Sequence, residues 1–201
     1  NGVLLNIGTL TADELQSMIR AGKAANEKGV PVVIDPVGVA ATPFRTTAMK
    51  EILTEVKPTV IKGNAGELAH LVEVPWETKG VESIGDGDAD EIASKVTEAY
   101  SCTAVVTGKT DVICIGNEML HNTTGHPLLG KITGAGCLLG SILTACLSTN
   151  DAIEQQVLTA VRFYGLAAEY VAEQTDVNGP GTFLPHFIDA LSYDPATLER
   201  T

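Results

Sequence analysis

The sequence predicts an α/β protein with an open, mostly parallel central sheet. Short apolar runs with strand character alternate along the chain with longer segments of helical periodicity, which is the order of βαβ units. Residues 31–35 are apolar up to a final carboxylate, as a strand covered by helices on both faces requires. With 201 residues, 44% of them hydrophobic, the chain is long enough for a sizeable core, and we expect a single domain over residues 1–201.

The first half of the chain predicts three strands, each followed by a helix. Thr11 and Glu14 have the spacing of a capping box at a helix start, and Gly29 marks the end of that helix. Asn64 is in position to cap a short helix that runs to Leu71. The expected strands are 3–7, 31–35 and 59–61, and a further helix is expected at 48–56.

The second half predicts one more strand, a hairpin and four helices. Gly116 and Asn117 separate two strand-like runs and favour a tight hairpin turn. The acidic stretch 85–90 is expected to be a solvated loop, because its spacing lacks the full calcium-loop pattern. The expected strands are 104–107, 111–115 and 118–121, and the expected helices are 88–100, 135–147, 152–173 and 184–191.

Composition and charge disfavour several function classes. The formal net charge of -12 argues against a nucleic-acid partner, because proteins that bind the phosphate backbone carry a basic face. The four cysteines form no CxxC pair, so zinc and redox sites are disfavoured and a reducing cytoplasm is expected. No apolar run reaches membrane-spanning length. Since Asn1 and Gly2 lead directly into a strand-like run, we expect an N-terminal segment to be missing.

Polar side chains close the second and third predicted strands, at the edge where open α/β sheets bind ligands. Asp35 is kept out of helical conformation by Pro36; it would bind magnesium, order its waters or orient a hydroxyl, or only cap a turn. Lys62 would meet a nucleotide phosphate, or lie at the surface as an isolated charge. Glu67 stands three residues after Asn64 and is expected at the same edge, unless the two residues form only a capping box.

Two glycines precede the helical pattern at 135–147 in the run Thr133-Gly134-Ala135-Gly136-Cys137. A helix N-terminus offers N–H groups without partners and a partial positive charge, and glycines let phosphate oxygens approach the backbone. The same field favours a thiolate at the cysteine. Taken alone, the glycines favour the simpler interpretation, a tight strand-to-helix turn with a small buried thiol.

These elements together suit metal-assisted phosphoryl transfer. That chemistry needs a cradle for phosphate oxygens, carboxylates for magnesium, and a group near the acceptor hydroxyl. Thr107 and Gly108 close the fourth strand and would contact a nucleotide, or form a plain turn. Neither a Walker A motif nor a GxGxxG after a first strand is present, so P-loop and dinucleotide sites are unsupported.

Four motifs resemble those of hydroxyethylthiazole kinase, a family of the ribokinase-like superfamily. They are Asp-Pro-Val-Gly at 35–38, Lys-Gly-Asn-Ala-Gly-Glu at 62–67, Val-Val-Thr-Gly at 105–108 and Thr-Gly-Ala-Gly-Cys at 133–137. The resemblance extends over nearly the whole chain. Its specific part is Cys137, because most ribokinase-like relatives have aspartate at that position.

The resemblance implies a ribokinase-like three-layer α/β/α fold and a cytoplasmic enzyme of thiamine biosynthesis and salvage. The family phosphorylates the hydroxyl of 4-methyl-5-(2-hydroxyethyl)thiazole with ATP and magnesium. The resemblance also implies a homotrimer, with the thiazole site built between neighbouring subunits. A segment that would precede residue 1 supplies part of that site in the family.

The resemblance also implies individual roles. Cys137 matches the position beside the substrate hydroxyl, as a general base or as a group that orients the hydroxyl. Gly134 matches a substrate contact. Three sets of assignments remain. Asp35, Gly134 and Gly136 would belong to the catalytic centre with Cys137, and Lys62, Thr107 and Thr133 would contact ATP. Asp35 and Glu67 would bind magnesium.

Two other functions are compatible with the same fold. A hydroxymethylpyrimidine kinase would share most of the motifs, but Cys137 in place of aspartate argues against it. A nucleotide-binding subunit without turnover would keep the fold, but Glu67 and the glycine-led helix start are intact.

Overall fold

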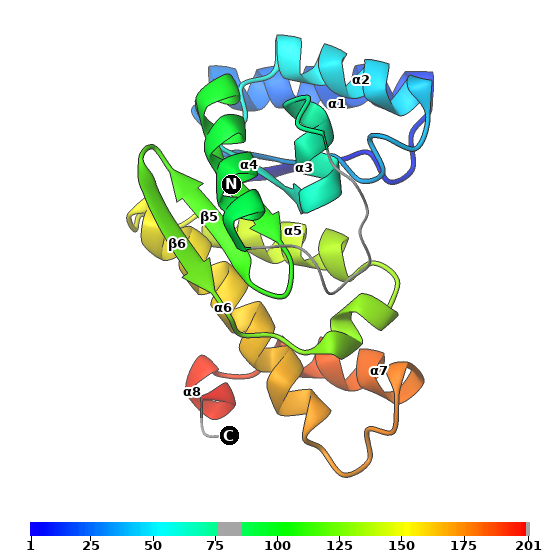
Figure 1. The fold of residues 1–201 in the computed structure, drawn as a ribbon, viewed down its shortest axis with the longest axis vertical. Helices are drawn as coiled ribbons and strands as arrows, with labels where there is room; N and C mark the ends of the chain where they lie inside the picture. Colours follow the sequence, from blue (N-terminus) through cyan, green and yellow to red (C-terminus); the bar gives the residue numbers. More distant parts are fainter. Residues whose placement is uncertain (76–85, 200–201) are drawn as a thin grey trace.

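One six-stranded sheet organises the residues that the computed structural model describes, 1–75 and 86–199 (Figure 1). The strands lie side by side in chain order, with β1 to β4 parallel and β4, β5 and β6 antiparallel. Their bounds are Val3–Asn6 for β1, Val32–Asp35 for β2, Val60–Asn64 for β3, Thr103–Thr107 for β4, Asp111–Ile115 for β5 and Glu118–Asn122 for β6. The predicted hairpin around Gly116 is confirmed.

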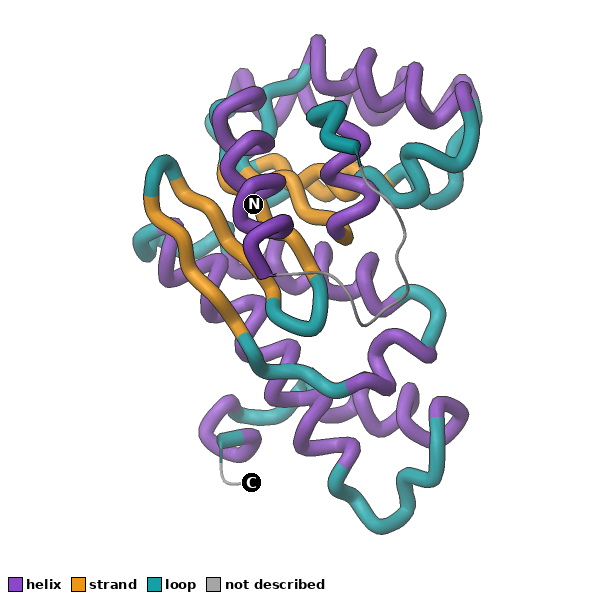
Figure 2. The backbone as a smooth tube through the Cα atoms, in the orientation of Figure 1, coloured by secondary structure: helices purple, strands orange, loops and turns teal. Residues whose placement is uncertain are grey.

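Helices cover both faces of the sheet, which confirms the predicted three-layer α/β/α arrangement (Figure 2). The first face carries α1 Ala12–Glu27, α2 Pro43–Glu55, α3 Ala65–Leu71 and α4 Asp86–Tyr100. The second carries α5 Ala135–Cys146, α6 Ile153–Ala172, α7 Pro180–Ala190 and α8 Pro195–Leu198, with the 3-10 helix η1 Pro127–Lys131. The molecule therefore has two hydrophobic cores separated by the sheet.

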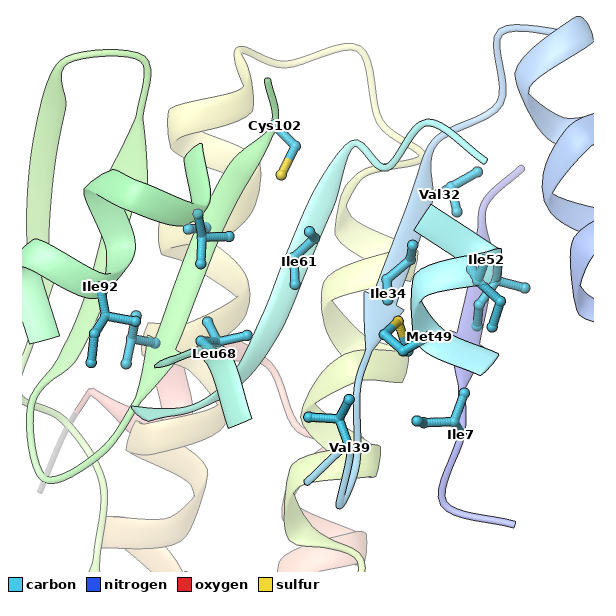
Figure 3. Close-up of a cluster of buried hydrophobic side chains, with 14 of the residues drawn as sticks. Ile7, Val32, Ile34, Val39, Met49, Ile52, Ile61, Leu68, Ile92 and Cys102 are labelled. Atoms are coloured by element: carbon cyan, nitrogen blue, oxygen red, sulfur yellow. The ribbon is translucent and has the colours of Figure 1, made fainter. Parts of the chain in front are cut away.

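Strand β2 shows how one strand serves both cores. Successive side chains of a strand point to opposite faces. Val32 and Ile34 accordingly pack into the first core, shown in Figure 3, whereas Val33 packs into the second. All three side chains are completely buried, which explains why this strand is apolar without alternation.

Three helix starts differ from the sequence-based prediction. Helix α2 begins at Pro43 rather than 48, because the Thr42 hydroxyl accepts a hydrogen bond from the N–H of Arg45 and proline fits the first helical position. Proline likewise opens α7, at Pro180 rather than 184. The third is α4, which begins at Asp86 rather than 88. Residues 86–90 of the predicted acidic loop are therefore helical and the loop prediction is wrong there, while residue 85 lies outside the described residues.

Two short elements had no clear periodic signal. Helix α8 and η1 are each a single short turn with proline at its start, too brief for a helical apolar pattern to develop. Cys102 and Cys114 are buried, as predicted for small core residues. No helix among the described residues has both the length and the apolar character needed to cross a bilayer.

Helix α6 passes very close to the chain that follows β6. Gly165 is buried on α6, and a Cβ atom there would lie 2.6 Å from the carbonyl carbon of Thr124 and 2.7 Å from its oxygen. The Thr124 hydroxyl is itself held by a 2.9 Å hydrogen bond to the side-chain oxygen of Asn122. Glycine is therefore required at 165 for packing.

We expect Gly165→Ala to lower the free energy of unfolding by about 1–3 kcal/mol, the usual cost of overpacking against a rigid backbone. Gly181→Ala on α7 is the matched control, because no atom lies within 4 Å of the Cβ position there. Urea denaturation of both variants and the wild type measures the difference. Equal stability of the two variants would contradict the close approach.

Candidate active site

The candidate site lies where the parallel strands end and α5 begins. In the sheet register Asn6 of β1 lies opposite Asp35 of β2, and Asn64 of β3 lies opposite Thr107 of β4. The polar residues named from the sequence therefore share one edge of the sheet. Helix α5 contacts both β1 and β2, which brings its glycine-led start to the same edge.

A buried ion pair forms the base of this site. The carboxylate of Asp35 is completely buried, and its Oδ2 accepts hydrogen bonds from Asn6 Nδ2 at 2.9 Å and Lys62 Nζ at 3.1 Å. Burial raises the pKa of the Asp35 carboxyl, and the Lys62 ammonium holds that rise back. Asp35 Oδ1 is, among the described residues, a buried side-chain oxygen without a hydrogen-bond partner.

Lys62 connects this ion pair to α5. Its Nζ donates to the carbonyl oxygen of Gly136 at 2.8 Å, and the side chain is only 3% exposed. The surface charge considered from the sequence is thus ruled out. The phosphate contact that the resemblance implies for Lys62 stays a prediction, and the ammonium lies at the turn where that contact would be made.

The start of α5 is open to solvent. Gly134 is the N-cap residue with φ 89°, a left-handed conformation that favours glycine, and no side chain caps the helix. Thr133, Gly134 and Gly136 are exposed, and Cys137 is half-buried. The first N–H groups of a helix have no intrahelical partner, so this turn presents donors and a partial positive charge to an incoming anion.

A second buried side chain reaches the same turn from α6. The hydroxyl of Tyr164 donates to the carbonyl oxygen of Ala135 at 2.6 Å. Burial raises the pKa of Tyr164, so the hydroxyl stays protonated and acts as a donor. The sequence placed Tyr164 only in the apolar stripe of its helix; a buried tyrosine hydroxyl that needs a partner was the signal available.

Glu67 joins the ends of β2 and β3. It forms a capping box with Asn64, because the N–H of Glu67 donates to Asn64 Oδ1 at 2.9 Å and the N–H of Asn64 donates to Glu67 Oε2 at 3.0 Å. Glu67 Oε1 accepts a further hydrogen bond from the N–H of Gly38 at 2.8 Å. The carboxylate lines a pocket of about 340 Å³ together with His70 and Val74. Glu67 is therefore both a helix cap and a wall of a cavity.

These carboxylates fit magnesium only with outside ligands. Among the described residues no three acidic, histidine or cysteine side chains group closely enough to hold a metal. The charge of Glu67 nevertheless raises the pKa of Asp35, which places both carboxylates within electrostatic range. Magnesium at phosphoryl-transfer sites uses one or two carboxylates and completes its shell with phosphates and water. The pair suits that kind of site.

A separate network holds the turn after β4. The N–H of Gly108 donates to Asp111 Oδ1 at 3.1 Å, and Asn122 Nδ2 donates to Asp111 Oδ2 at 3.0 Å. Burial raises the pKa of Asp111, while these hydrogen bonds lower it. Thr107 stands half-buried at the start of this turn. Asp111 was missed from the sequence, where it read only as the first residue of a strand.

The predicted site residues thus form two groups. The first turn of α5 joins Asp35 through Lys62, with Thr133, Gly134, Gly136 and Cys137 on one continuous stretch. Glu67 lies on the first turn of α3, and its capping partner Asn64 is paired with Thr107 in the register of β3 and β4.

Sequence comparison and structure comparison with known proteins both find the same family. The model of the hydroxyethylthiazole kinase family matches residues 1–194. Hydroxyethylthiazole kinase 1 of Oceanobacillus iheyensis is 61% identical over 198 residues, which are 98% of this chain and 77% of that protein.

Among solved structures, the hydroxyethylthiazole kinase protein of Pyrococcus horikoshii has a TM-score of 0.86 and 33% identity, covering 100% of this chain and 74% of its own. A ribokinase-like superfamily protein of Enterococcus faecalis, 18% identical with a TM-score of 0.65, covers 98% of this chain and 63% of its own and shares the fold. The match over nearly the whole sequence, together with the open glycine-led helix above a buried ion pair, means that the chain belongs to the hydroxyethylthiazole kinase family.

Proposed function

We propose that this protein transfers the γ-phosphoryl group of ATP to the hydroxyl of 4-methyl-5-(2-hydroxyethyl)thiazole, in thiamine biosynthesis and salvage. Family membership supports the substrate. The observation that carries the chemistry is the uncapped, solvent-exposed start of α5 with Cys137 on its first turn. A partial positive charge at that place stabilises the negative charge of a transferring phosphoryl group.

Positioning of the two substrates contributes most of the rate acceleration in such a transfer, because the transition state is largely dissociative. In our proposal the N–H groups around Gly134 and Gly136 hold the transferring phosphoryl group. Gly134 also contacts the thiazole alcohol, while Thr107 and Thr133 contact the nucleotide. Thr107 is the last residue of β4 and Thr133 lies in the turn before α5, which supports this assignment.

Magnesium, when bound, would supply positive charge that offsets the negative charge of the phosphates. Glu67 and Asp35 are the residues that we propose to hold it, partly through water. Asp35 Oδ1 supports this as a buried acceptor without a partner in the described structure. The Lys62 ammonium opposes the rise that burial causes in the pKa of Asp35, which favours the ionised carboxylate.

We further propose a cytoplasmic homotrimer with thiazole sites between neighbouring subunits. The reasons are the family resemblance and the half-buried, open position of Cys137, which leaves room for a partner to complete a pocket. Cys137 lies beside the acceptor hydroxyl and either accepts its proton or orients it.

A substrate panel tests the function. We expect ADP release from ATP and magnesium with the thiazole alcohol, and at most weak release with a hydroxymethylpyrimidine. A preference for the pyrimidine would move the protein to the rival kinase. ATP binding without ADP release on either alcohol would instead indicate a subunit without turnover.

Substitution of Cys137 separates its two roles. If the thiolate is a general base, Cys137→Ser lowers kcat by about 10²–10⁴-fold, the usual contribution of a general base, whereas Cys137→Asp retains activity. The measurement is kcat with the thiazole alcohol at saturating ATP. Equal kcat for Cys137→Ser and wild type would leave Cys137 only the orienting role.

Glu67→Gln tests the metal assignment. The amide keeps an oxygen for one backbone N–H but removes the charge, so we expect the magnesium concentration for half-maximal activity to rise by about ten-fold. Because Glu67 also caps α3, the melting temperature is measured on the same sample. An unchanged magnesium titration would remove Glu67 from the metal site.

A further inference from the structure

Two consecutive carbonyl groups at the start of α5 accept hydrogen bonds from buried side chains outside the helix. The Tyr164 hydroxyl of α6 donates to Ala135 at 2.6 Å, and Lys62 Nζ of β3 donates to Gly136 at 2.8 Å. Tyr164 is 4% exposed and Lys62 3% exposed. Both donors therefore act from inside the protein, beneath the open turn.

These hydrogen bonds do not satisfy the helix end in the usual way. At a helix N-terminus the groups without partners are N–H groups, whereas the carbonyls of the first turn already accept from the next turn. A side-chain cap would occupy those N–H groups, and α5 has no such cap. Tyr164 and Lys62 instead bind the opposite ends of the peptide units.

Each carbonyl shares a rigid, planar peptide unit with the next N–H group. The carbonyl of Ala135 belongs to the unit that carries the N–H of Gly136, and the carbonyl of Gly136 to the unit that carries the N–H of Cys137. A donor on the carbonyl fixes the orientation of its plane and polarises the unit, which strengthens the N–H as a donor. Tyr164 and Lys62 thus control the two N–H groups that face the proposed phosphoryl site.

Close packing keeps this arrangement tight. A Cβ atom at Gly136 would lie 3.2 Å from Lys62 Nζ, and one at Gly140 would lie 3.3 Å from Leu4. Asp35 Oδ2 and the helix start hold the Lys62 ammonium from two sides. The helix therefore rests directly on the ion pair and has little freedom to shift.

We propose that Tyr164 and Lys62 are positioning residues for phosphoryl transfer, which orient the N–H groups of Gly136 and Cys137, and that Tyr164 does so without touching either substrate. This inference rests on the proposed function.

Tyr164→Phe gives the sharpest test, because it removes one hydroxyl and keeps the ring that packs edge-on against Phe187. We expect kcat to fall by about ten-fold or more, with KM for ATP and for the thiazole alcohol changed by less than about three-fold. Tyr100→Phe is the matched control, since its hydroxyl also donates to a backbone carbonyl, that of Leu71 at 3.0 Å, on α4 and away from α5. We expect the control to lose comparable stability but to keep kcat.

Lys62→Gln adds a second measurement. Glutamine retains a donor but not the charge, so we expect reduced kcat. A rise in KM for ATP at unchanged kcat would show a direct phosphate contact and overturn the positioning role of Lys62. If this variant does not fold, Tyr164→Phe still decides the inference.

The wild type in the same assay separates the two proposals. A wild type that releases no ADP overturns the proposed function and this inference with it. A wild type that turns over at the same kcat as Tyr164→Phe overturns the inference alone.

Discussion

The buried ion pair between Asp35 and Lys62 is the interaction on which the rest of the site depends. An ion pair removed from water is costly unless further hydrogen bonds satisfy both groups. Asn6 supplies one to the carboxylate, and the carbonyl of Gly136 accepts one from the ammonium. The ion pair therefore joins three strands to the start of α5, so the proposed phosphoryl-transfer site rests directly on the sheet.

The glycines of α5 are the counterpart of that ion pair. Gly134 takes a left-handed conformation that ends the preceding turn, and Gly136 and Gly140 let the helix approach the ammonium and β1 closely. A Cβ atom at Gly136 or Gly140 would force Lys62 Nζ or the Leu4 side chain to move by a few tenths of an ångström. Because glycine has no side chain, the same residues also leave the solvent-facing side of the turn open. The close packing against the sheet and the access from solvent therefore have the same cause.

Carboxylates around the site act first as structural groups. Glu67 holds the backbone N–H groups of Asn64 and Gly38, and Asp111 holds that of Gly108. Each fixes a turn at the end of a strand, where a ligand would otherwise meet a loose loop. Glu67 combines this with a place on a pocket wall, which shows that a helix cap and a ligand site need not be alternatives.

The sequence by itself determined the α/β class, most elements, the strand-end residues and the glycine-led turn, because periodicity, caps and motifs are local signals. It missed the proline-started turns of α2 and α7, where the apolar pattern begins later than the helix. Only the tertiary structure decided that Lys62 is buried, that Tyr164 reaches Ala135 and that Asp111 holds Gly108. The hydrogen bonds of Lys62 and Tyr164 join residues far apart in the chain, so they form only when sheet and helices pack together.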